Sequence, residues 1–222
     1  FYIEKLYRDF KLSGAELDDE KKNKLRAIDE RLAAIIPKFQ ENVLKSTNEF
    51  ELWIETESDL AGLPESARTA AKEAASQKGK PGAWLVTLHH PSYVPFITYA
   101  DNRELREKLY RAYVTRAAHG PYDNQKYLVE MVQLMHDKAA LTGQPTYADY
   151  ALQNRMADST QTVRSFLDKM HAVVRPAAEK ELQEVQEFAR TLNGPEKLQV
   201  WDFAYYSEKL KQKKYAFDSE AL

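Results

Sequence analysis

The pattern of apolar and polar positions predicts a chain built mostly from helices. Between about residues 18 and 48, large apolar side chains recur every three or four positions, which is the spacing of one helix face. Pro37 falls inside this stripe, where it removes one backbone donor and crowds the carbonyl of Ala33. We therefore expect a kink or a break there. The stripe consists of Leu25, Ile28, Leu32, Ile35, Phe39 and Val43.

The second half of the chain repeats the helical pattern several times. Pro176 lies inside the longest of these segments, so that segment is interpreted as one helix or as two helices meeting near Val174. Asn193, Gly194 and Pro195 form a strong stop signal, with glycine at the C-cap and proline just beyond it. The prolines at 91 and 95 predict an irregular connection between those two residues. Helices are expected at about residues 102–118, 124–142, 147–154, 160–192 and 203–215.

Two short segments have the pattern of β-strands. Residues 50–55 alternate, with Leu52 and Ile54 on one side and Trp53 on the other, and residues 84–88 are rich in aromatic and branched side chains. An alanine-rich helix is expected between them at about residues 65–77. The predicted architecture is mainly α, a single multi-helix domain over residues 1–222 with a small β-hairpin-like insert.

Both ends of the chain have the pattern of interior segments. Residues 1–10 read as the tail of an amphipathic helix, with Ile3, Leu6, Tyr7 and Phe10 on one face. Residues 218–222 begin with an N-cap residue type and read as the start of another helix. We interpret the chain as a fragment of a larger protein. We also expect bare apolar stripes at residues 1–10 and 203–217, where a missing half would pack.

Composition indicates a folded globular protein and narrows its partners. Apolar residues make up 43% and charged residues 30% of the 222 positions, a balance typical of folded domains. The formal net charge of −2 gives no electrostatic case for nucleic acid. The chain lacks cysteine and any run of 18 apolar residues, so disulfides, thiolate metal sites and a membrane span are not expected. The basic run of Lys209, Lys211, Lys213 and Lys214 is interpreted as a solvated helix face.

The histidines do not form a recognisable zinc motif. A helical zinc peptidase site needs two histidines at i and i+4 with a glutamate beside the first, and no pair here has that spacing. His136 with Asp137, and Asp168 with His171, are interpreted as ordinary helix-face pairs. His89 and His90 are expected at a strand end, as surface or loop residues. The five histidines are His89, His90, His119, His136 and His171.

Other catalytic motifs are equally absent from the sequence. There is no nucleophile elbow and no glycine-rich phosphate loop, and the chain has only seven glycines. Acidic pairs such as Asp18 with Asp19, and Asp101 with Glu104, suit helix N-termini. The tyrosine pairs are interpreted as packing residues rather than as a ligand cage. We therefore assign no catalytic residue and no metal ligand, and the substrate-binding residues stay unknown. The tyrosine pairs are Tyr110 with Tyr113 and Tyr205 with Tyr206.

Several stretches nevertheless carry motifs of one family. They are ENVL through TNEFEL at 41–52, DLAGLPES at 59–66, YADNRELREKLY at 99–110, and WD at 201–202 with YYSEK at 205–209. In these stretches the chain resembles the thimet-oligopeptidase-like zinc peptidases, and the resemblance covers essentially its whole length. Within the family the resemblance is closest to the bacterial peptidyl-dipeptidase branch, with the oligopeptidase A branch next.

The resemblance implies a large, mostly helical enzyme with a deep channel between two halves, of which this chain would be a part. The family's zinc sits on an H-E-x-x-H helix that lies C-terminal to the matched region, so no ligand can be carried over to any position here. The implied cofactor of the full-length parent is zinc, and the implied partners are short peptides and the missing catalytic half. C-terminal dipeptide release is favoured over internal cleavage. The location is expected to be cytoplasmic, with the periplasm left open. The alternative is a stand-alone helical binding domain without enzymatic activity.

Overall fold

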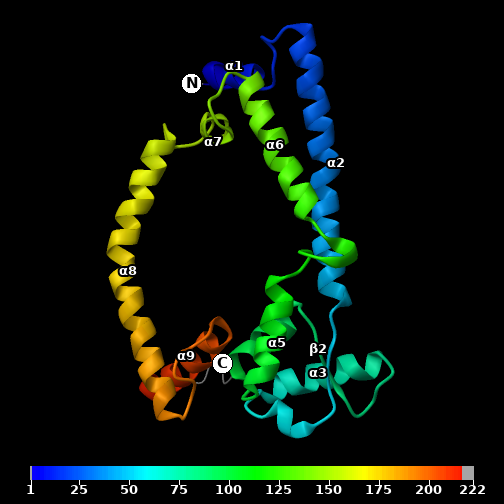
Figure 1. Ribbon diagram of the computed structural model, residues 1–222, viewed down its shortest axis with the longest axis vertical. Helices are drawn as coiled ribbons and strands as arrows, with labels where there is room; N and C mark the ends of the chain where they lie inside the picture. The colour runs from blue at the N-terminus through cyan, green and yellow to red at the C-terminus, as the bar shows by residue number, and fades with distance from the viewer. Residues whose placement is uncertain (1, 217–222) are drawn as a thin grey trace. The chain divides into compact units, whose positions relative to one another are not determined.

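The computed structural model describes residues 2–216, which are mainly helical with one small antiparallel sheet (Figure 1). This confirms the predicted fold class, including the small two-stranded element. The predicted helix start at Asp218 lies outside the described residues. The helices and strands are α1 (Tyr2–Leu12), α2 (Asp19–Glu49), β1 (Leu52–Ile54), α3 (Glu65–Gln77), β2 (Trp84–Val86), α4 (His90–Tyr99), α5 (Arg103–Val114), α6 (Gln125–Leu141), α7 (Tyr147–Leu152), α8 (Thr160–Thr191) and α9 (Val200–Tyr215).

The chain divides into two compact units. Unit 1 comprises Phe1–Asn42 and Ala118–Arg175, and unit 2 comprises Val43–Ala117 and Pro176–Leu222. The division falls inside the two longest helices, α2 and α8. The prediction of a single domain stays a prediction.

Unit 2 has its main core around the sheet. Trp53 pairs with Leu85 in the antiparallel register of β1 and β2. Leu52 and Ile54 are buried while Trp53 is half-buried, so the predicted alternation of β1 is confirmed. Helix α3 packs on β2, and α4 and α5 both contact α9. The buried core residues are Leu52, Ile54, Leu60, Leu63, Val86, Leu88, Phe96, Ala100 and Leu109.

A second core in unit 2 joins the end of α8 to α9 through Val185, Ala189, Tyr205 and Tyr206. The predicted stop signal after α8 is confirmed, because α8 ends at Thr191. The left-handed residue of the turn is Asn193, with φ of 56°, and not the glycine beside it.

Gly194 is required in that turn for lack of space. A Cβ atom there would lie 2.5 Å from the Tyr206 hydroxyl oxygen and 2.8 Å from the Ala189 carbonyl oxygen. The Gly194 N–H donates to that same carbonyl at 2.9 Å. The glycine therefore lets the chain pass close to α9, and asparagine, which tolerates the left-handed region, makes the turn.

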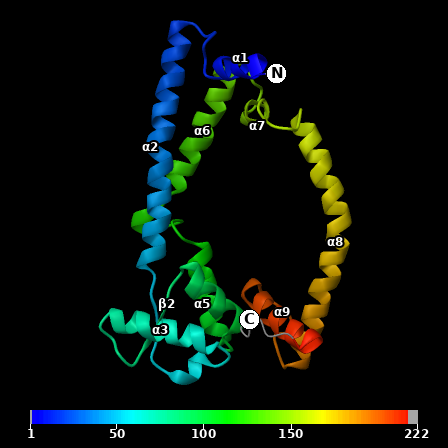
Figure 2. The same cartoon turned by 180° about the vertical axis from the view of Figure 1, so that it is seen from behind.

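Unit 1 is built on α2 and α6, which lie side by side in both views (Figures 1 and 2). The predicted stripe of α2 is buried at Leu25, Ile28, Leu32 and Ile35. Polar contacts add to this packing: the side-chain N–H of Asn42 donates to the Asn124 side-chain oxygen at 2.9 Å. Asn124 in turn donates to a backbone carbonyl of α2 at 2.9 Å.

Proline breaks fewer helices than the sequence indicated. Helix α2 continues through Pro37 and α8 continues through Pro176, so the break expected at Pro37 and the division near Val174 are wrong. A proline inside a helix costs roughly 3 kcal/mol. In α2, buried residues on both sides of Pro37 offset that cost.

The irregular connection expected at residues 91–95 is also wrong, because α4 runs from His90 to Tyr99. Pro91 lies in the first turn of α4, where a missing N–H removes no intrahelical hydrogen bond. His89 is the N-cap position and His90 the first helical residue. These two histidines therefore begin a helix and do not end a strand.

Candidate functional site

A buried arginine–aspartate pair links α5 to α9 within unit 2. Arg106 is 1% exposed and Asp202 is fully buried, and Arg106 Nη2 lies 3.2 Å from Asp202 Oδ1. Arg103, one turn earlier in α5, contacts both oxygens of the same carboxylate at 2.9 and 2.8 Å. The carboxylate of Asp202 therefore receives a two-point contact from one guanidinium and a further N–H from another.

Arg106 makes three further hydrogen bonds. Its Nη1 donates to the carbonyls of Ala100 at 2.6 Å and Asp101 at 3.2 Å, and its Nε donates to the carbonyl of Trp201 at 3.2 Å. Burial lowers the pKa of the Arg106 guanidinium, and the hydrogen bond to Asp202 opposes that shift. A buried charge with four hydrogen bonds to its surroundings is held in one geometry. The pair therefore fixes α9 against the α4–α5 connection.

An aromatic ring covers this pair. The guanidinium carbon of Arg106 lies 4.0 Å from the ring centre of Tyr205, within cation–π range. The Tyr205 hydroxyl donates to Asp101 Oδ1 at 2.6 Å. Burial, followed by that hydrogen bond, raises the pKa of the Tyr205 hydroxyl. Lys209 Nζ lies 3.3 Å from the same Asp101 oxygen.

The acids expected at helix N-termini have two different outcomes. Asp18 Oδ1 accepts the backbone N–H of Lys21 at 2.8 Å at the start of α2, which confirms that prediction. Asp101 instead bonds to α9, as described above. The cap of α5 is Asn102, whose side-chain oxygen accepts from the N–H of Leu105 at 3.1 Å.

The described cluster is suited to holding helices together rather than to acid–base chemistry. Its charged groups are bonded to one another, so none is left to exchange a proton with a substrate. The Nε1 of Trp201 and the hydroxyl of Ser207 are buried atoms without a hydrogen-bond partner among the described residues. Trp201 is instead flanked by the guanidinium carbons of Arg103 and Arg111, at 5.7 and 4.8 Å from its ring centre.

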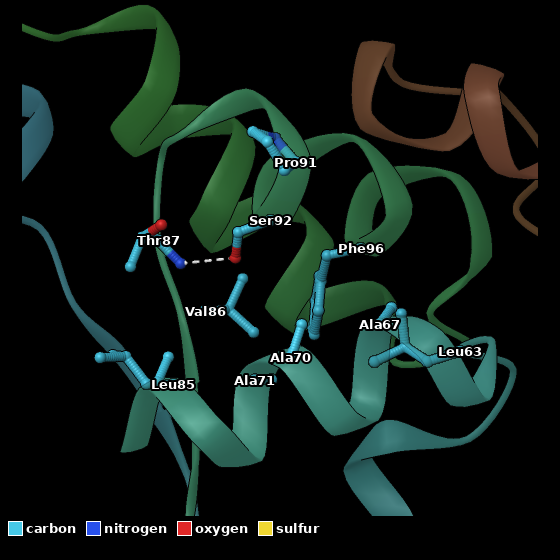
Figure 3. Close-up of a pocket in the computed structure, with 11 residues that line it drawn as sticks. Leu63, Ala67, Ala70, Ala71, Leu85, Val86, Thr87, Pro91, Ser92 and Phe96 are labelled. Carbon is cyan, nitrogen blue, oxygen red and sulfur yellow. Dashed lines mark hydrogen bonds between the residues drawn. The ribbon is translucent and has the colours of Figure 1, made fainter. Parts of the chain in front are cut away.

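A small cavity of about 140 Å³ lies between α3, β2 and α4 (Figure 3). Alanines of α3, among them Ala70 and Ala71, form one wall, and Phe96 forms another. The hydroxyl of Ser92 accepts the backbone N–H of Thr87 at 2.9 Å. No titratable side chain lines this cavity, so its surface suits an apolar group and offers no acid or base.

All five histidines are exposed, as predicted for His89 and His90. In the part of the chain that the structure describes, no three His, Cys, Asp or Glu side chains form a group able to hold a metal ion. These residues therefore do not fit the zinc that the resemblance implies, and no metal-assisted step is assigned to any of them.

The tyrosine pairs pack against other aromatic rings, as predicted. Tyr113 stacks on Tyr93 with ring centres 4.1 Å apart, and Tyr110 lies 5.9 Å from Trp201. The rings of Tyr205 and Tyr206 meet edge to face at 4.9 Å.

The lysine run of α9 is the predicted solvated face only in part, since Lys213 and Lys214 are exposed. Lys209 and Lys211 are half-buried. Lys213 lies over the Phe188 ring at 5.2 Å, and Lys214 pairs with Glu184. Lys209, Lys213 and Lys214 thus contact residues outside α9, whereas Lys211 pairs with Glu208 of α9 itself.

The apolar stripes expected at the two ends are exposed to different extents. The stripe of α1 is exposed, with Ile3 at 79% and Phe10 at 58%, so that prediction is confirmed for residues 2–10. The stripe expected at residues 203–217 is confirmed only in part: Phe203 and Tyr215 are exposed, but Tyr205 and Tyr206 are buried against α8. Phe217 lies outside the described residues.

Exposed apolar stripes on α6 and α8 were missed by sequence reasoning. Their apolar residues recur at helical spacing, but periodicity alone does not tell whether a partner covers them. The exposed residues are Leu128, Val129 and Val132 on α6, and Phe166, Leu167, Met170, Val173 and Val174 on α8. Within residues 2–216, no helix is long and apolar enough to cross a membrane.

Comparisons with known proteins place the chain in one family. The sequence model of peptidase family M3 matches residues 96–222. The chain is 43% identical to oligopeptidase A of Haemophilus influenzae and 42% identical to that of Escherichia coli, over 99% of this chain and 33% of each relative. It is 30% identical to the dipeptidyl carboxypeptidase of Salmonella typhimurium, over 99% of this chain and 32% of that protein.

Two consequences follow from these identities. The chain spans about a third of the length of the curated relatives it matches. The predicted order within the family is wrong, because identity to oligopeptidase A exceeds identity to the dipeptidyl carboxypeptidase. The family model covers more than half of the chain, and the chain belongs to peptidase family M3.

Proposed function

We propose that this chain is a non-catalytic helical part of a longer zinc peptidase that hydrolyses short peptides. One observation carries the proposal: 99% of the chain aligns with a single third of oligopeptidase A. The sequence holds no H-E-x-x-H motif, and its described residues offer no three-ligand group for a metal. Zinc and its ligands would therefore belong to the remainder of the longer chain.

The contribution of this chain to the longer enzyme would be structural. The bonded cluster of Arg103, Arg106 and Asp202 holds α9 to α5 without leaving a free acid or base. The exposed stripes of α1, α6 and α8 offer apolar surface to the rest of the chain. Contiguous exposed apolar surface commonly marks an interaction site.

For the cleavage mode, we propose internal cleavage of oligopeptides, as in an oligopeptidase. The higher identity to oligopeptidase A supports this choice over release of C-terminal dipeptides, the mode implied by the name dipeptidyl carboxypeptidase. Mass spectrometry of the products of a ten-residue peptide distinguishes the two modes. Internal fragments support the first mode, and successive losses of two residues from the C-terminus support the second.

The test of the main proposal compares this chain with a hybrid enzyme. In the hybrid, this chain replaces the matched third of H. influenzae oligopeptidase A. Hydrolysis of a short fluorogenic peptide should be absent with this chain alone and present, and sensitive to a chelator, with the hybrid. Chelator-sensitive turnover by this chain alone, or one zinc ion retained per chain after dialysis, would overturn the proposal. An inactive but folded hybrid would favour the alternative, a stand-alone helical binding domain.

We also propose a cytoplasmic location. A relative from Arabidopsis thaliana that is 34% identical is named a probable cytosolic oligopeptidase A, whereas a second Arabidopsis relative is named organellar. Cell fractionation with an antibody to this chain is the measurement. Recovery in a periplasmic extract would replace the cytoplasmic location with the periplasmic alternative.

A further inference from the structure

Helix α8 carries one apolar stripe with two different environments. Towards its C-terminal end, Val185, Phe188 and Ala189 are buried. Towards its N-terminal end lies what we call the α8 stripe, which is exposed: Phe166 is 62% and Val173 75% exposed. Met170 and Phe188 are 18 residues apart, which is about five turns at 3.6 residues per turn, so they hold the same position in the helical period. The α8 stripe consists of Phe166, Leu167, Met170, Val173 and Val174.

The covered end of α8 shows what kind of element fits this surface. Its partner is helix α9, which supplies Tyr205, Tyr206 and Leu210 to the apolar contact. The charges of the two partners are opposite in sign. Residues 176–191 carry four glutamates against one lysine and one arginine, and α9 is rich in lysine. Lys214 of α9 pairs with Glu184, and Lys213 lies over Phe188.

The exposed end of α8 has the reverse charge. Residues 160–175 carry Arg164, Lys169 and Arg175 against a single acid, Asp168. A basic helix would meet like charge on this surface, and a helix with acidic flanks would meet opposite charge. A second copy of the same stripe would bring two basic surfaces together, so self-association through it is disfavoured.

We propose that the α8 stripe is the docking surface for an amphipathic helix with acidic flanks, supplied by the two thirds of an M3 peptidase chain that this sequence does not match. The proposal rests on the proposed function, that this chain works as part of a longer peptidase. Two observations support it: the stripe continues an existing helix–helix contact on the same helix, and the relatives are about three times as long as this chain. Apolar periodicity of three and four residues fits a helical partner.

Thiol labelling tests this docking without depending on catalysis. The chain lacks cysteine, so Met170→Cys introduces a single thiol within the stripe. Ala172→Cys is the matched control, because Ala172 is exposed on the opposite side of α8. In this chain alone, both thiols should react rapidly with a maleimide. In the hybrid with H. influenzae oligopeptidase A, the Met170→Cys thiol should react at least about tenfold more slowly, with the Ala172→Cys thiol unchanged. Peptide mass mapping locates the label, and circular dichroism checks that each variant folds.

The outcomes separate the docking proposal from the proposed function. Equal labelling of the two thiols in the hybrid would overturn the docking proposal, even if the hybrid hydrolyses peptides. Protection of the Met170→Cys thiol in an inactive hybrid would support the docking and count against the proposed function. Protection in this chain alone that disappears on dilution would identify a second copy as the occupant and overturn the proposal.

The acidic character of the partner has its own test. Adding Arg164→Glu and Lys169→Glu to the Met170→Cys hybrid should return its labelling rate towards that of the isolated chain, because like charges would then face each other. The control is Lys180→Glu, which makes one such charge reversal on the acidic half of α8. Equal labelling rates with and without the Arg164→Glu and Lys169→Glu pair would overturn the assignment of acidic flanks.

Discussion

The two units of this chain bury their apolar residues to different degrees. All three clusters of buried apolar residues among the described residues belong to unit 2. Unit 1 buries one face of α2 and little of α6, whose residue Val129 is 70% exposed, and it leaves the apolar face of α1 bare. Both units have helices with clear apolar periodicity, so periodicity does not account for the difference. The units differ because a packing partner covers the apolar stripes of unit 2 and only some of those of unit 1.

The physical reason is that helices need tertiary packing for most of their stability. Unit 2 supplies that packing itself, because α3 and α4 pack on β2, and α5 and α9 pack on α4 and on each other. In unit 1, part of the apolar surface has no partner within the described residues. At about 25 cal/mol per Å² of apolar area, each stripe that gains a partner adds stability that the isolated unit lacks.

Breaking the buried ion pair should produce the largest loss, and it should be confined to unit 2. Arg106→Leu leaves Asp202 buried with one cationic partner fewer, and such a loss costs about 3–5 kcal/mol. Urea unfolding followed by circular dichroism measures the free energy of unfolding. The control is Lys24→Leu, whose ion pair with Glu20 is 60% exposed on the lysine side and should cost at most about 1 kcal/mol. Equal losses would mean that burial does not decide the strength of this link.

A matched pair of leucine truncations tests the difference between the units directly. Leu109 in unit 2 is 0% exposed and Leu128 in unit 1 is 53% exposed. Leu109→Ala should lower the free energy of unfolding by about 2–5 kcal/mol, and Leu128→Ala should change it by less than about 0.5 kcal/mol. The measurement is again urea unfolding. A large loss from Leu128→Ala in this chain would contradict the view that unit 1 leaves this surface uncovered.

Two glycine substitutions test the same difference between the units in the packing around the backbone. Gly62 and Gly143 both have positive φ, 84° and 74°. A Cβ atom at Gly62 would lie 2.3 Å from the Tyr99 carbonyl oxygen, whereas nothing lies within 4 Å at Gly143. Gly143→Ala should therefore cost only the backbone strain of about 1–2 kcal/mol, and Gly62→Ala should cost more. Thermal unfolding of the two variants gives the order, and the reverse order would show that unit 2 is not tightly packed there.

The smallest expected effect is the loss of helicity when the cap at the exposed start of α2 is removed. The backbone N–H of Lys21 lowers the pKa of the Asp18 carboxyl. The stabilisation from this cap is therefore present above the ordinary pKa of aspartate and is lost as pH falls through the lowered value. Asp18→Ala should reduce helicity at neutral pH, measured by circular dichroism, with little further change on acidification. Asp18→Asn keeps the acceptor and should hold its helicity down to low pH; acid sensitivity equal to that of the unchanged chain would contradict this account.

The sequence predicted the class of the fold well because helical and strand periods are local properties. The stripe of α2, the alternation at Leu52, Trp53 and Ile54, and the stop after α8 were all readable from neighbouring residues. The effect of the prolines on the helices was predicted less accurately. The energetic cost of Pro37 is local, but the packing that offsets it is not.

The buried cluster of unit 2 could not be predicted in the same way. Arg103 and Arg106 are 99 and 96 positions from Asp202, and no local signal pairs residues at that separation. Asp101 looked like a helix-capping acid and the α9 lysines looked solvated. The first interpretation failed and the second held only for Lys213 and Lys214, because α9 returns to pack on α5 and α8.

The sequence by itself determined that this chain is mainly helical, that it carries a pair of short strands, and that its residues resemble an M3 peptidase without a zinc motif. The tertiary structure decided which apolar stripes are covered, which charges are buried, and which prolines a helix tolerates. The physical reason is that helical period and motif are set by residues a few positions apart. Burial depends on which segments meet in space, as the opposite environments of Met170 and Phe188 on one helix demonstrate.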